Sequence, residues 1–277
     1  MSRPYAEVIG DPIAHSKSPL IHNFWLAKLG IDADYRACHV RPGELADYFA
    51  RRRADPDWRG CNVTIPHKEQ VAPFLGGVRP EGAKVGAVNT VFRDPAEGLV
   101  GTNTDVDGVR EALRCIDLKG RAVIVIGAGG AARAAFADLE GLDVAEVRVI
   151  ARSPLKAQSV VEHFGLPARF FGFDAETGPF AQAAAVINAT QLGMTGQPAM
   201  PAAVLAGLGA TASDCLVFDM VYAPLRTDLL NAAHALKRRT SHGLTMLVGQ
   251  ARTAFARFFG AVPPAGFDAE LFELLTA

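Results

Sequence analysis

Short runs of apolar residues alternate with segments of helical spacing along almost the whole chain. Continuous apolar runs are typical of buried strands, and recurrence every three or four positions is typical of amphipathic helices. Strands that alternate with helices predict α/β layering with mainly parallel sheets. The expected strands cover residues 5–10, 34–40, 60–65, 122–126, 146–151, 169–173, 184–188 and 216–220, with a hairpin of 85–93 and 98–102.

Helices are expected between these strands, and the first carries clear end signals. Ser18 before Pro19 is the pattern of an N-cap followed by a proline in the first turn, and Gly30 is placed to end the same helix. The expected helices cover residues 18–29, 43–53, 105–115, 131–139, 224–239 and 244–259, with a short one between Pro66 and Leu75.

The composition describes a chain that buries a sizeable core. Of 277 residues 49% are hydrophobic, and 28 basic residues against 29 acidic ones give a net charge of −1. That balance lacks the basic excess of a nucleic-acid binder. No apolar run is long enough to span a membrane, and the N-terminus lacks the pattern of a signal peptide. The four cysteines stand far apart, as buried thiols in a reducing cytoplasm would.

A glycine-rich turn directly follows the apolar strand 122–126 and directly precedes a helix. Its spacing fits the G-x-G-x-x-[G/A] pattern of dinucleotide-binding sites, although such turns also occur without a ligand. Glycine permits the tight turn and the close approach of a pyrophosphate, which would lie at the positive end of the helix. The residues concerned are Gly127, Ala128, Gly129, Gly130 and Ala131.

The end of the next strand favours NADP over NAD. NAD sites carry a carboxylate there for the ribose hydroxyls. This chain has Arg152, Ser153 and Lys156 instead, with no acidic residue beside them. A guanidinium, a hydroxyl and an ammonium suit a 2′-phosphate, whereas the alternative is a solvated helix start.

Four polar clusters follow predicted strands of the N-terminal half. They contain Ser16 and Ser18, Asn62 to Lys68, Asn89 and Thr90, and Asn103 to Asp105. Loops at the carboxyl ends of parallel strands line the ligand crevice of such sheets. Each cluster alone could be a cap or a turn, but the four together indicate a polyhydroxylated small ligand.

No metal is expected, because His15, His22 and His67 lack a metal-ligand spacing with a carboxylate. His67 is expected at the rim of the ligand site, and His22 is expected to pack or hydrogen-bond on its helix.

At this point the sequence resembles the shikimate dehydrogenase family. The resemblance runs from Val8 to about Gly260 through eight ordered blocks, which is more specific than any one motif. The blocks are Gly10-Asp11-Pro12-Ile13-Ala14-His15-Ser16-Lys17-Ser18-Pro19, Asn62-Val63-Thr64-x-Pro66-x-Lys68, Gly86-Ala87-x-Asn89-Thr90, Gly101-x-Asn103-Thr104-Asp105-x-x-Gly108, the glycine turn, Asn188-Ala189-Thr190-x-x-Gly193-Met194, Tyr222-x-Pro224-x-x-Thr227 and Met246-Leu247-x-x-Gln250-Ala251.

The resemblance implies two domains and a place in the shikimate pathway to chorismate and the aromatic amino acids. The implied domains are a substrate-binding catalytic domain over residues 1–105, a Rossmann-type NADP-binding domain over 106–239, and C-terminal helices over 240–277 that return to the substrate domain. The reaction implied is the NADP-dependent interconversion of 3-dehydroshikimate and shikimate, by a monomer or homodimer in the cytoplasm.

The family's residue roles carry over to matching positions. Lys68 and Asp105 would be the catalytic pair. The implied substrate contacts are Ser16, Ser18, Thr64, Asn89, Asp105, Tyr222 and Gln250. The implied cofactor contacts are the five residues of the glycine turn, Arg152, Ser153, Lys156, Asn188, Thr190, Met220, Gly243 and Met246.

Two positions depart from the family's pattern. Ala151 stands where members commonly have Asn, which removes an amide from the expected phosphate site. Thr245 stands where members commonly have Gly, near the expected nicotinamide. The second departure bears on substrate preference more than on the reaction class.

The chemistry of a secondary alcohol also leaves alternatives. Its oxidation by a nicotinamide requires removal of the hydroxyl proton, which a lysine coupled to an aspartate can take. The same pair would serve a dehydrogenase of quinate or another cyclic polyol acid. A non-catalytic NADP-binding sensor is the alternative of another class.

Overall fold

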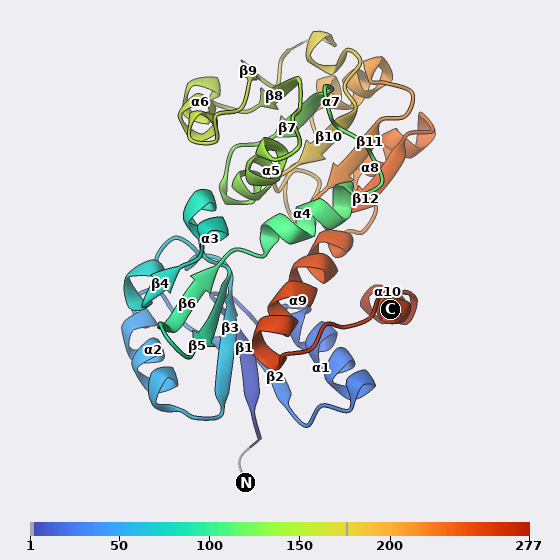
Figure 1. Ribbon diagram of the computed structural model, residues 1–277. Coiled ribbons are helices and arrows are strands. Elements are labelled where there is room, and N and C mark those ends of the chain that lie inside the picture. The colour runs from blue at the N-terminus through green and yellow to red at the C-terminus, as the bar shows by residue number, and fades with distance from the viewer. Residues whose placement is uncertain (1–2, 176) are drawn as a thin grey trace. The chain divides into compact units, whose positions relative to one another are not determined.

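The computed structural model describes residues 3–175 and 177–277, and the chain divides into two compact units (Figure 1). The first unit combines Met1–Thr104 with Gln250–Ala277, and the second is Asp105–Gly249. The second boundary lies later than the expected 239/240. Residues up to His242 pair with the second unit's sheet as its last strand, and helix α9 (Gly243–Phe259) begins in that unit.

The first unit contains a six-stranded mixed sheet in the order β2-β1-β3-β5-β6-β4. Strand β1 pairs in parallel with β2 and β3, whereas β5 runs antiparallel to both β3 and β6. The strands are β1 (Tyr5–Gly10), β2 (Asp34–His39), β3 (Trp58–Val63), β4 (Gly77–Val78), β5 (Thr90–Asp94) and β6 (Gly98–Thr102).

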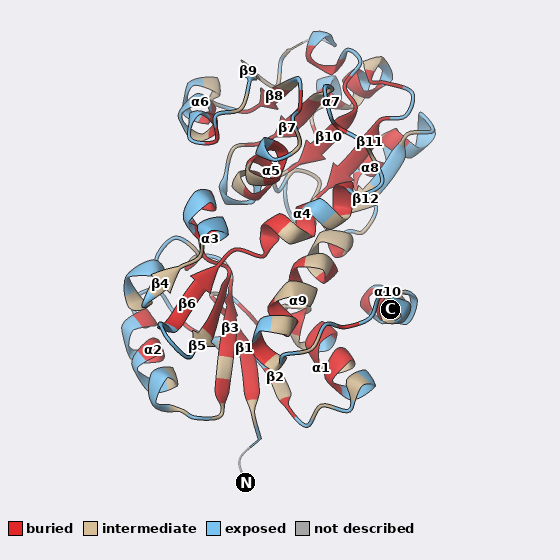
Figure 2. Cartoon of the chain, viewed as in Figure 1, coloured by how far each residue is buried: buried red, intermediate tan, exposed pale blue. Residues whose placement is uncertain are grey.

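Helices cover both faces of this sheet. On one face, Tyr48 and Phe49 of α2 pack with Trp58 and Val91 in an apolar cluster. On the other face, Trp25 of α1 packs edge-on against Phe255 of α9. Figure 2 shows β1, β3, β5 and β6 largely buried, β2 and β4 less so, and the outer sides of the helices exposed. The unit's helices are α1 (Ser18–Leu29), α2 (Leu45–Ala54), α3 (Pro80–Val85) and α10 (Asp268–Thr276), together with the C-terminal part of α9 and the 3-10 turns Ala72–Phe74 and Ala265–Phe267.

The second unit contains a six-stranded parallel sheet in the order β12-β11-β10-β7-β8-β9. Numbered within the unit, this order is 3-2-1-4-5-6, the doubly wound arrangement of dinucleotide-binding domains. The order reverses between β7 and β10, where such domains bind their ligand. The strands are β7 (Ala122–Ile126), β8 (Glu146–Ile150), β9 (Ala168–Phe171), β10 (Ala185–Asn188), β11 (Leu216–Asp219) and β12 (Arg239–His242).

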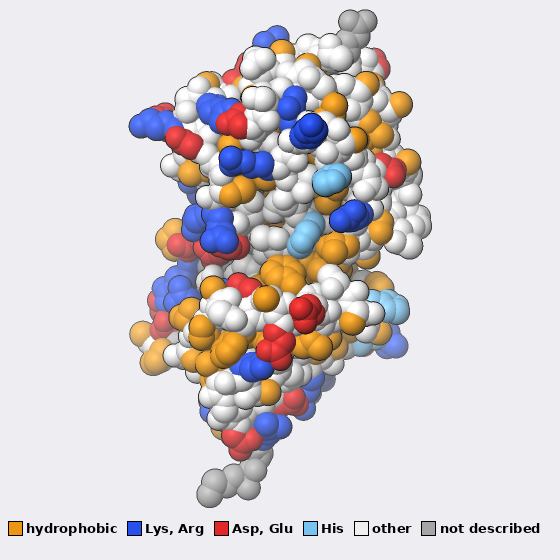
Figure 3. Space-filling view, turned by 90° about the vertical axis from the view of Figure 1, so that its right-hand side faces the viewer, with side chains coloured by type: hydrophobic (Ala, Val, Ile, Leu, Met, Phe, Trp, Pro, Cys, Tyr) orange, Lys and Arg blue, Asp and Glu red, His pale blue; other side chains and the backbone are white. Residues whose placement is uncertain are grey.

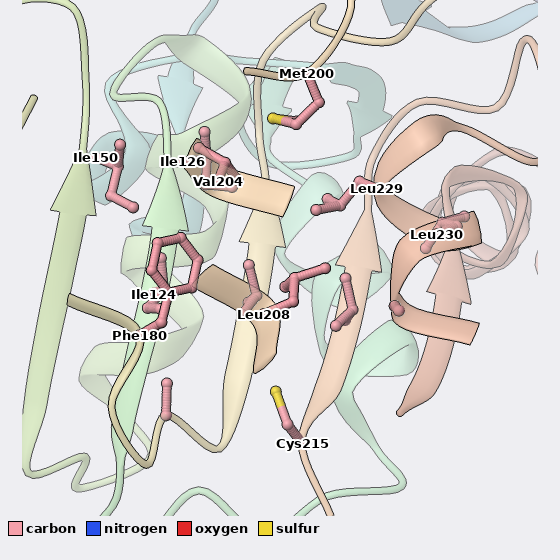
Figure 4. Close-up of a cluster of buried hydrophobic side chains, with 14 residues drawn as sticks. Ile124, Ile126, Ile150, Phe180, Met200, Val204, Leu208, Cys215, Leu229 and Leu230 are labelled. Carbon is pink, nitrogen blue, oxygen red and sulfur yellow. The ribbon is translucent and has the colours of Figure 1, made fainter. Parts of the chain in front are cut away.

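Side chains alternate across this sheet, so each face has its own core. Ile124 and Ile126 of β7 pack with Phe180, Leu208 and Leu229 on the face covered by α7 and α8 (Figure 4). Helices α4, α5 and α6 contribute nothing to that cluster and pack on one another in series on the opposite face. The unit's helices are α4 (Asp105–Leu113), α5 (Gly130–Glu140), α6 (Pro154–Glu162), α7 (Ala202–Gly207) and α8 (Asp228–Ala235), with 3-10 turns at Gly178–Phe180 and Leu208–Ala210.

The mixed α/β architecture with mainly parallel sheets is confirmed, but several element bounds were wrong. The segment 224–239 is not one helix: α8 ends at Ala235, Lys237 adopts φ 57°, and β12 follows. The strand expected from residue 85 begins only at Thr90, because α3 occupies 80–85. The stretch up to Leu75 is a turn and a 3-10 turn rather than a helix.

The start of α1 also differs from expectation. The N-cap residue is Lys17, and Ser18 is the first helical residue, with no side-chain cap. The hydroxyl of Ser16 lies 3.3 Å from the backbone nitrogen of Ser18 and accepts its hydrogen bond. The capping role expected of Ser18 therefore falls to Ser16.

Candidate active site

The polar clusters of the first unit meet at one edge of its sheet. Because β6 runs antiparallel to β5 and β5 antiparallel to β3, the carboxyl ends of β3 and β6 lie beside the amino end of β5. Asn62, Thr90 and Thr102 stand opposite one another in the register of these strands. The sequence spreads these residues over forty positions, and the sheet brings them together.

Asn89 is the centre of a buried hydrogen-bond network at this edge. Its Oδ1 accepts from the Thr90 hydroxyl at 2.9 Å and from the Thr104 amide at 2.7 Å. Its Nδ2 donates to Thr104 Oγ1 at 3.1 Å. Thr104 Oγ1 lies 3.4 Å from Oε1 of Gln250. Two of the expected substrate contacts, Asn89 and Gln250, are thus joined through Thr104.

Lys68 and Thr64 lie in the loop after β3. The Val88 amide donates to the Lys68 carbonyl at 2.8 Å, which fixes the backbone of Lys68 one residue from Asn89. The Thr64 amide donates to the carbonyl of Ile9 at 2.9 Å. A Cβ atom on Gly10 would lie 2.5 Å from Cγ2 of Thr64, so only glycine at position 10 permits this close approach.

The serine loop after β1 is held at both ends. The Ser16 amide donates to the Ile13 carbonyl at 3.1 Å, and Lys17 Nζ donates to the Leu275 carbonyl of α10 at 2.7 Å. Ser18 is buried and Ser16 is half-buried. Paired hydroxyls in this setting can donate to a carboxylate without a fixed positive charge.

The glycine turn of the second unit has the shape of an anion cradle. Gly127 has φ +103°, a conformation that favours glycine, and its amide donates to the Ile150 carbonyl at 2.8 Å. No atom lies within 4 Å of a Cβ added to Gly129 or Gly130, and no side chain caps α5 at Gly129. The first turn of α5 therefore presents backbone amides beside open space, as a pyrophosphate requires.

The residues expected to meet the 2′-phosphate begin α6. Arg152 and Lys156 are exposed, and Ser153 is the N-cap residue of the helix. Within the described part of the chain neither Arg152 nor Lys156 forms an ion pair, so no carboxylate competes for these charges. Ala151 is buried, and its amide donates to Phe171 of β9 at 3.0 Å.

The carboxyl ends of β10 and β11 carry a network that sequence reasoning missed. Asn188 Nδ2 donates to Asp219 Oδ1 at 2.9 Å, and the Thr227 hydroxyl donates to Asp219 Oδ2 at 2.6 Å. The Thr190 amide and hydroxyl both donate to Asn188 Oδ1. Burial raises the pKa of Asp219, which is fully inaccessible to solvent. The sequence did carry one signal for this network, because Asp219 is a single carboxylate at the end of the apolar strand β11.

The remaining expected cofactor residues follow β11 and β12. A Cβ atom on Gly243 would lie 2.2 Å from the carbonyl oxygen of Met220, so glycine is required for these segments to meet. Tyr222 is half-buried, and burial raises its pKa. Thr245 Oγ1 lies 3.5 Å from Nδ1 of His242, and Met246 is half-buried one residue later.

The catalytic candidates divide between the units. Lys68 belongs to the first, and Asp105 is the first residue of the second, where it begins α4. Asp105 follows Thr104 directly in the chain, so the Asn89 network anchors the residue before it.

The histidine expectations were partly wrong. His67 is not a rim residue: it is buried, and its Nε2 lies 2.7 Å from the Val40 carbonyl. His22 is buried and stacked on Tyr35 with a ring separation of 3.9 Å, and burial lowers its pKa to about 3. Among the described residues no group of histidine, cysteine and acidic side chains could hold a metal.

The surface and the helices add two findings. Figure 3 shows basic and acidic side chains interspersed on the face it presents, without a continuous basic surface. In the described part of the chain no helix has the length and apolarity to cross a membrane.

Known proteins resemble this chain over nearly its whole length. Residues 8–91 match the model of the shikimate dehydrogenase substrate binding domain. The chain is 49% identical over 274 residues to the shikimate dehydrogenase (NADP(+)) of Sphingopyxis alaskensis, covering 99% of this chain and 97% of that protein. The chain belongs to the shikimate dehydrogenase family.

Solved structures of other family members agree in fold. The shikimate 5-dehydrogenase of Thermus thermophilus in complex with NADP(H) and shikimate is 34% identical, with a TM-score of 0.83 and coverage of 98% of this chain and 99% of that one. The enzyme of Listeria monocytogenes in complex with shikimate and NAD is 31% identical, with a TM-score of 0.87 and coverage of 99% and 96%. The family resemblance predicted from eight sequence blocks is confirmed.

Proposed function

We propose that this protein catalyses the NADP-dependent interconversion of 3-dehydroshikimate and shikimate, a step of the pathway to chorismate and the aromatic amino acids. The observation that carries the proposal is the near-full-length identity of 49% to a shikimate dehydrogenase (NADP(+)). The Asn89 network and the glycine cradle support it, because they provide a polar substrate site and a dinucleotide site in one chain.

The cofactor residues fit NADP. Gly129 and Gly130 leave room for the pyrophosphate at the start of α5. Arg152, Ser153 and Lys156 would hold the 2′-phosphate, and no acidic residue of this turn opposes them. Asn188, Thr190, Met220, Gly243 and Met246 would line the rest of the dinucleotide site, with Ala128 and Ala131 in the glycine turn. The bound cofactor supplies the hydride acceptor of the reaction.

The substrate residues bind by hydrogen bonds. The hydroxyls of Ser16 and Ser18 would hold the carboxylate, and Tyr222 would also contact it. Thr64, Asn89, Asp105 and Gln250 would hold the ring hydroxyls. Each is a neutral or acidic group of the kind that distinguishes hydroxyl positions on a ring.

Lys68 and Asp105 would carry the proton. In the oxidation of shikimate, the hydroxyl proton of the reacting carbon would pass to Lys68 Nζ as the carbonyl forms. In the reverse direction Lys68 returns that proton to the oxygen. Asp105 would act with Lys68 as one coupled unit, since a neighbouring carboxylate favours the ammonium form of a lysine.

The direct test is NADPH formation on mixing the purified protein with shikimate and NADP⁺, with parallel reactions containing NAD⁺ or quinate. We expect the fastest rise in absorbance at the NADPH wavelength with shikimate and NADP⁺, when all acids and both cofactors are supplied at the same low concentration. A protein that binds NADP⁺ but turns over none of these acids would instead be a sensor, and the proposal would fail.

We also propose a cytoplasmic location and a monomeric or homodimeric state. The four cysteines are free, as a reducing compartment keeps them. Cys61 and Cys215 are buried as expected, whereas Cys38 is partly buried and Cys115 is exposed. Light scattering on the purified protein determines the oligomeric state, and a tetramer would contradict this part of the proposal.

A further inference from the structure

A chain of buried hydrogen bonds leads into the substrate site from a tyrosine that belongs to none of the family's sequence blocks named above. The Tyr35 hydroxyl of β2 lies 2.7 Å from Asn62 Oδ1. Asn62 Nδ2 lies 2.9 Å from Thr90 Oγ1, and the Thr90 hydroxyl lies 2.9 Å from Asn89 Oδ1. Tyr35, Asn62 and Thr90 are buried, with exposed fractions of 1%, 5% and 0%.

The donors and acceptors of this chain run in one direction. Asn62 Nδ2 faces two acceptors, Thr90 Oγ1 and the Asn89 carbonyl at 3.3 Å, so Oδ1 is the end of that amide that faces Tyr35. A carbonyl oxygen only accepts, and the tyrosine must therefore donate. Burial raises the pKa of Tyr35 well above its ordinary value and keeps the phenol protonated for this role.

The hydrogen bonds at Asn89 have a defined donor and acceptor as well. Thr90 has one proton, and at 2.9 Å it goes to Asn89 Oδ1, which also accepts the Thr104 amide at 2.7 Å. These two bonds turn Oδ1 of Asn89 toward Thr90 and Thr104. Asn89 Nδ2 donates to Thr104 Oγ1, and that hydroxyl oxygen lies 3.2 Å from Asn89 Oδ1, 3.2 Å from Thr90 Oγ1 and 3.4 Å from Gln250 Oε1.

We propose that Tyr35, Asn62 and Thr90 are positioning residues that help to fix the amide orientation of Asn89 for substrate binding. The inference rests on the proposed function. It adds that the orientation of an amide that would bind a ring hydroxyl depends on a donor buried in β2.

The test uses Thr90→Val, which keeps the shape of the side chain and removes both hydrogen-bonding roles. We expect the shikimate KM to rise at least fivefold, the lower end of the effect of an unsatisfied buried polar group. The expected changes in kcat and in the KM for NADP⁺ are twofold or less. Thr90→Ser retains the hydroxyl and should restore the shikimate KM to within twofold of the wild-type value.

Tyr35→Phe tests the start of the chain and has a matched control. It keeps the ring stacked on His22 and removes only the donor to Asn62. Tyr48→Phe also removes a buried hydroxyl from the same unit, but that hydroxyl donates to Glu7 Oε1 at 2.6 Å, outside the chain. Both variants should lower the midpoint of urea unfolding, and only Tyr35→Phe should raise the shikimate KM.

The outcomes separate this inference from the proposed function. Wild-type protein that forms no NADPH from shikimate overturns the proposed function, and the inference with it. Active wild-type protein with an unchanged shikimate KM in folded Thr90→Val and Tyr35→Phe overturns the inference alone. An equal rise in Tyr48→Phe also overturns it, because the effect would then follow from loosened packing rather than from amide orientation.

Discussion

Gly127 and Thr190 lie in van der Waals contact, so the loops after β7 and β10 touch at the point where the strand order of the second sheet reverses. A Cβ atom on Gly127 would lie 2.7 Å from Cγ2 of Thr190. Thr190 is itself held by Asn188, whose side chain is fixed by the buried Asp219. The glycine turn is therefore shaped from the neighbouring strands as well as by its own sequence.

Gly127→Ala and Gly129→Ala should have different effects. The first adds a methyl group against Thr190 in a residue with φ +103°, and should lower both the melting temperature and the affinity for NADPH. The second adds a methyl group in open space at the start of α5, and should leave the melting temperature within about 2 °C while weakening NADPH binding by steric exclusion of the pyrophosphate. Thermal melts and NADPH fluorescence titrations of both variants measure this. Equal loss of stability in both would contradict the assignment of open space above α5.

Lys68→Ala should lower kcat about 100-fold or more, the usual contribution of acid–base catalysis, with a smaller change in the shikimate KM. Asp105→Asn should also lower kcat. Because the two residues handle one proton, the double variant should lose less than the product of the two single effects. Steady-state kinetics on all three variants test this. Near-normal turnover of Lys68→Ala would remove it as the proton carrier.

Arg152→Ala should raise the KM for NADP⁺ roughly 10- to 150-fold, because a hydrogen bond to a charged group contributes about 1.5–3 kcal/mol. The KM for NAD⁺ should change little, since NAD⁺ has no 2′-phosphate. Arg41→Ala, which removes an exposed arginine of the first unit, is the matched control. Equal losses with both cofactors would indicate a structural role for Arg152, and a wild-type preference for NAD⁺ would overturn the NADP assignment.

The parts of the fold that sequence predicted well are those with local signals. Strand β7, the glycine turn and α5 are contiguous, and each has the apolar pattern of its element. Strand β12 was missed because its residues Arg239–His242 are polar and pair with one neighbour only. Its extended conformation depends on β11, which no pattern within 224–239 reveals. Helix α3 did carry a signal, since Pro80 begins it and Gly86 ends it with φ 70°.

The residues of the candidate site divide in the same way, into those that the sequence identifies and those that only the fold reveals. Asn89 and Gln250 were found by resemblance, but the bonds that orient them join residues up to 146 positions apart. Tyr35 reads in the sequence as an ordinary aromatic residue of a strand, and its function as a donor depends on the register of β2 with β1. Asp219 has the same character, because its partners Asn188 and Thr227 come from other elements.

Asp138 should make stability depend on pH. Burial raises its pKa to about 6, although Arg110 Nε lies 3.1 Å from Oδ1. Between about pH 4 and pH 6 the folded protein then holds a proton that the unfolded chain has released, so the free energy of unfolding falls as pH rises through this window. The fall is up to about 3 kcal/mol, at about 1.36 kcal/mol for each pKa unit.

Urea unfolding at several pH values measures this contribution. Asp138→Asn should abolish this fall in the free energy of unfolding. The free energy of unfolding of the variant minus that of wild type should therefore be larger above pH 6 than at pH 4. Asp107→Asn removes the other carboxylate on Arg110, whose charge raises the pKa of Asp138 less than burial does, and should therefore keep most of the wild-type slope. The same slope in Asp138→Asn as in wild type would show that another group titrates.

Shikimate should be preferred over quinate by at least tenfold in kcat/KM. The hydroxyls of Ser16 and Ser18 would hold the carboxylate of either acid. Quinate differs from shikimate by an additional hydroxyl and a saturated carbon beside that carboxylate. A buried hydroxyl without a partner costs about 1–3 kcal/mol, or roughly 5- to 150-fold in kcat/KM.

Thr245 departs from the family's pattern near the expected nicotinamide and could alter the preference for shikimate. Its hydroxyl has a contact within its own segment, 3.5 Å from His242 Nδ1. We therefore expect Thr245→Gly to change the ratio of the two kcat/KM values by less than about threefold. Measurement of both acids at one pH with wild type and Thr245→Gly decides the matter. Parity of the two acids in wild type would contradict the preference, and a large shift of the ratio in Thr245→Gly would show that Thr245 helps to set it.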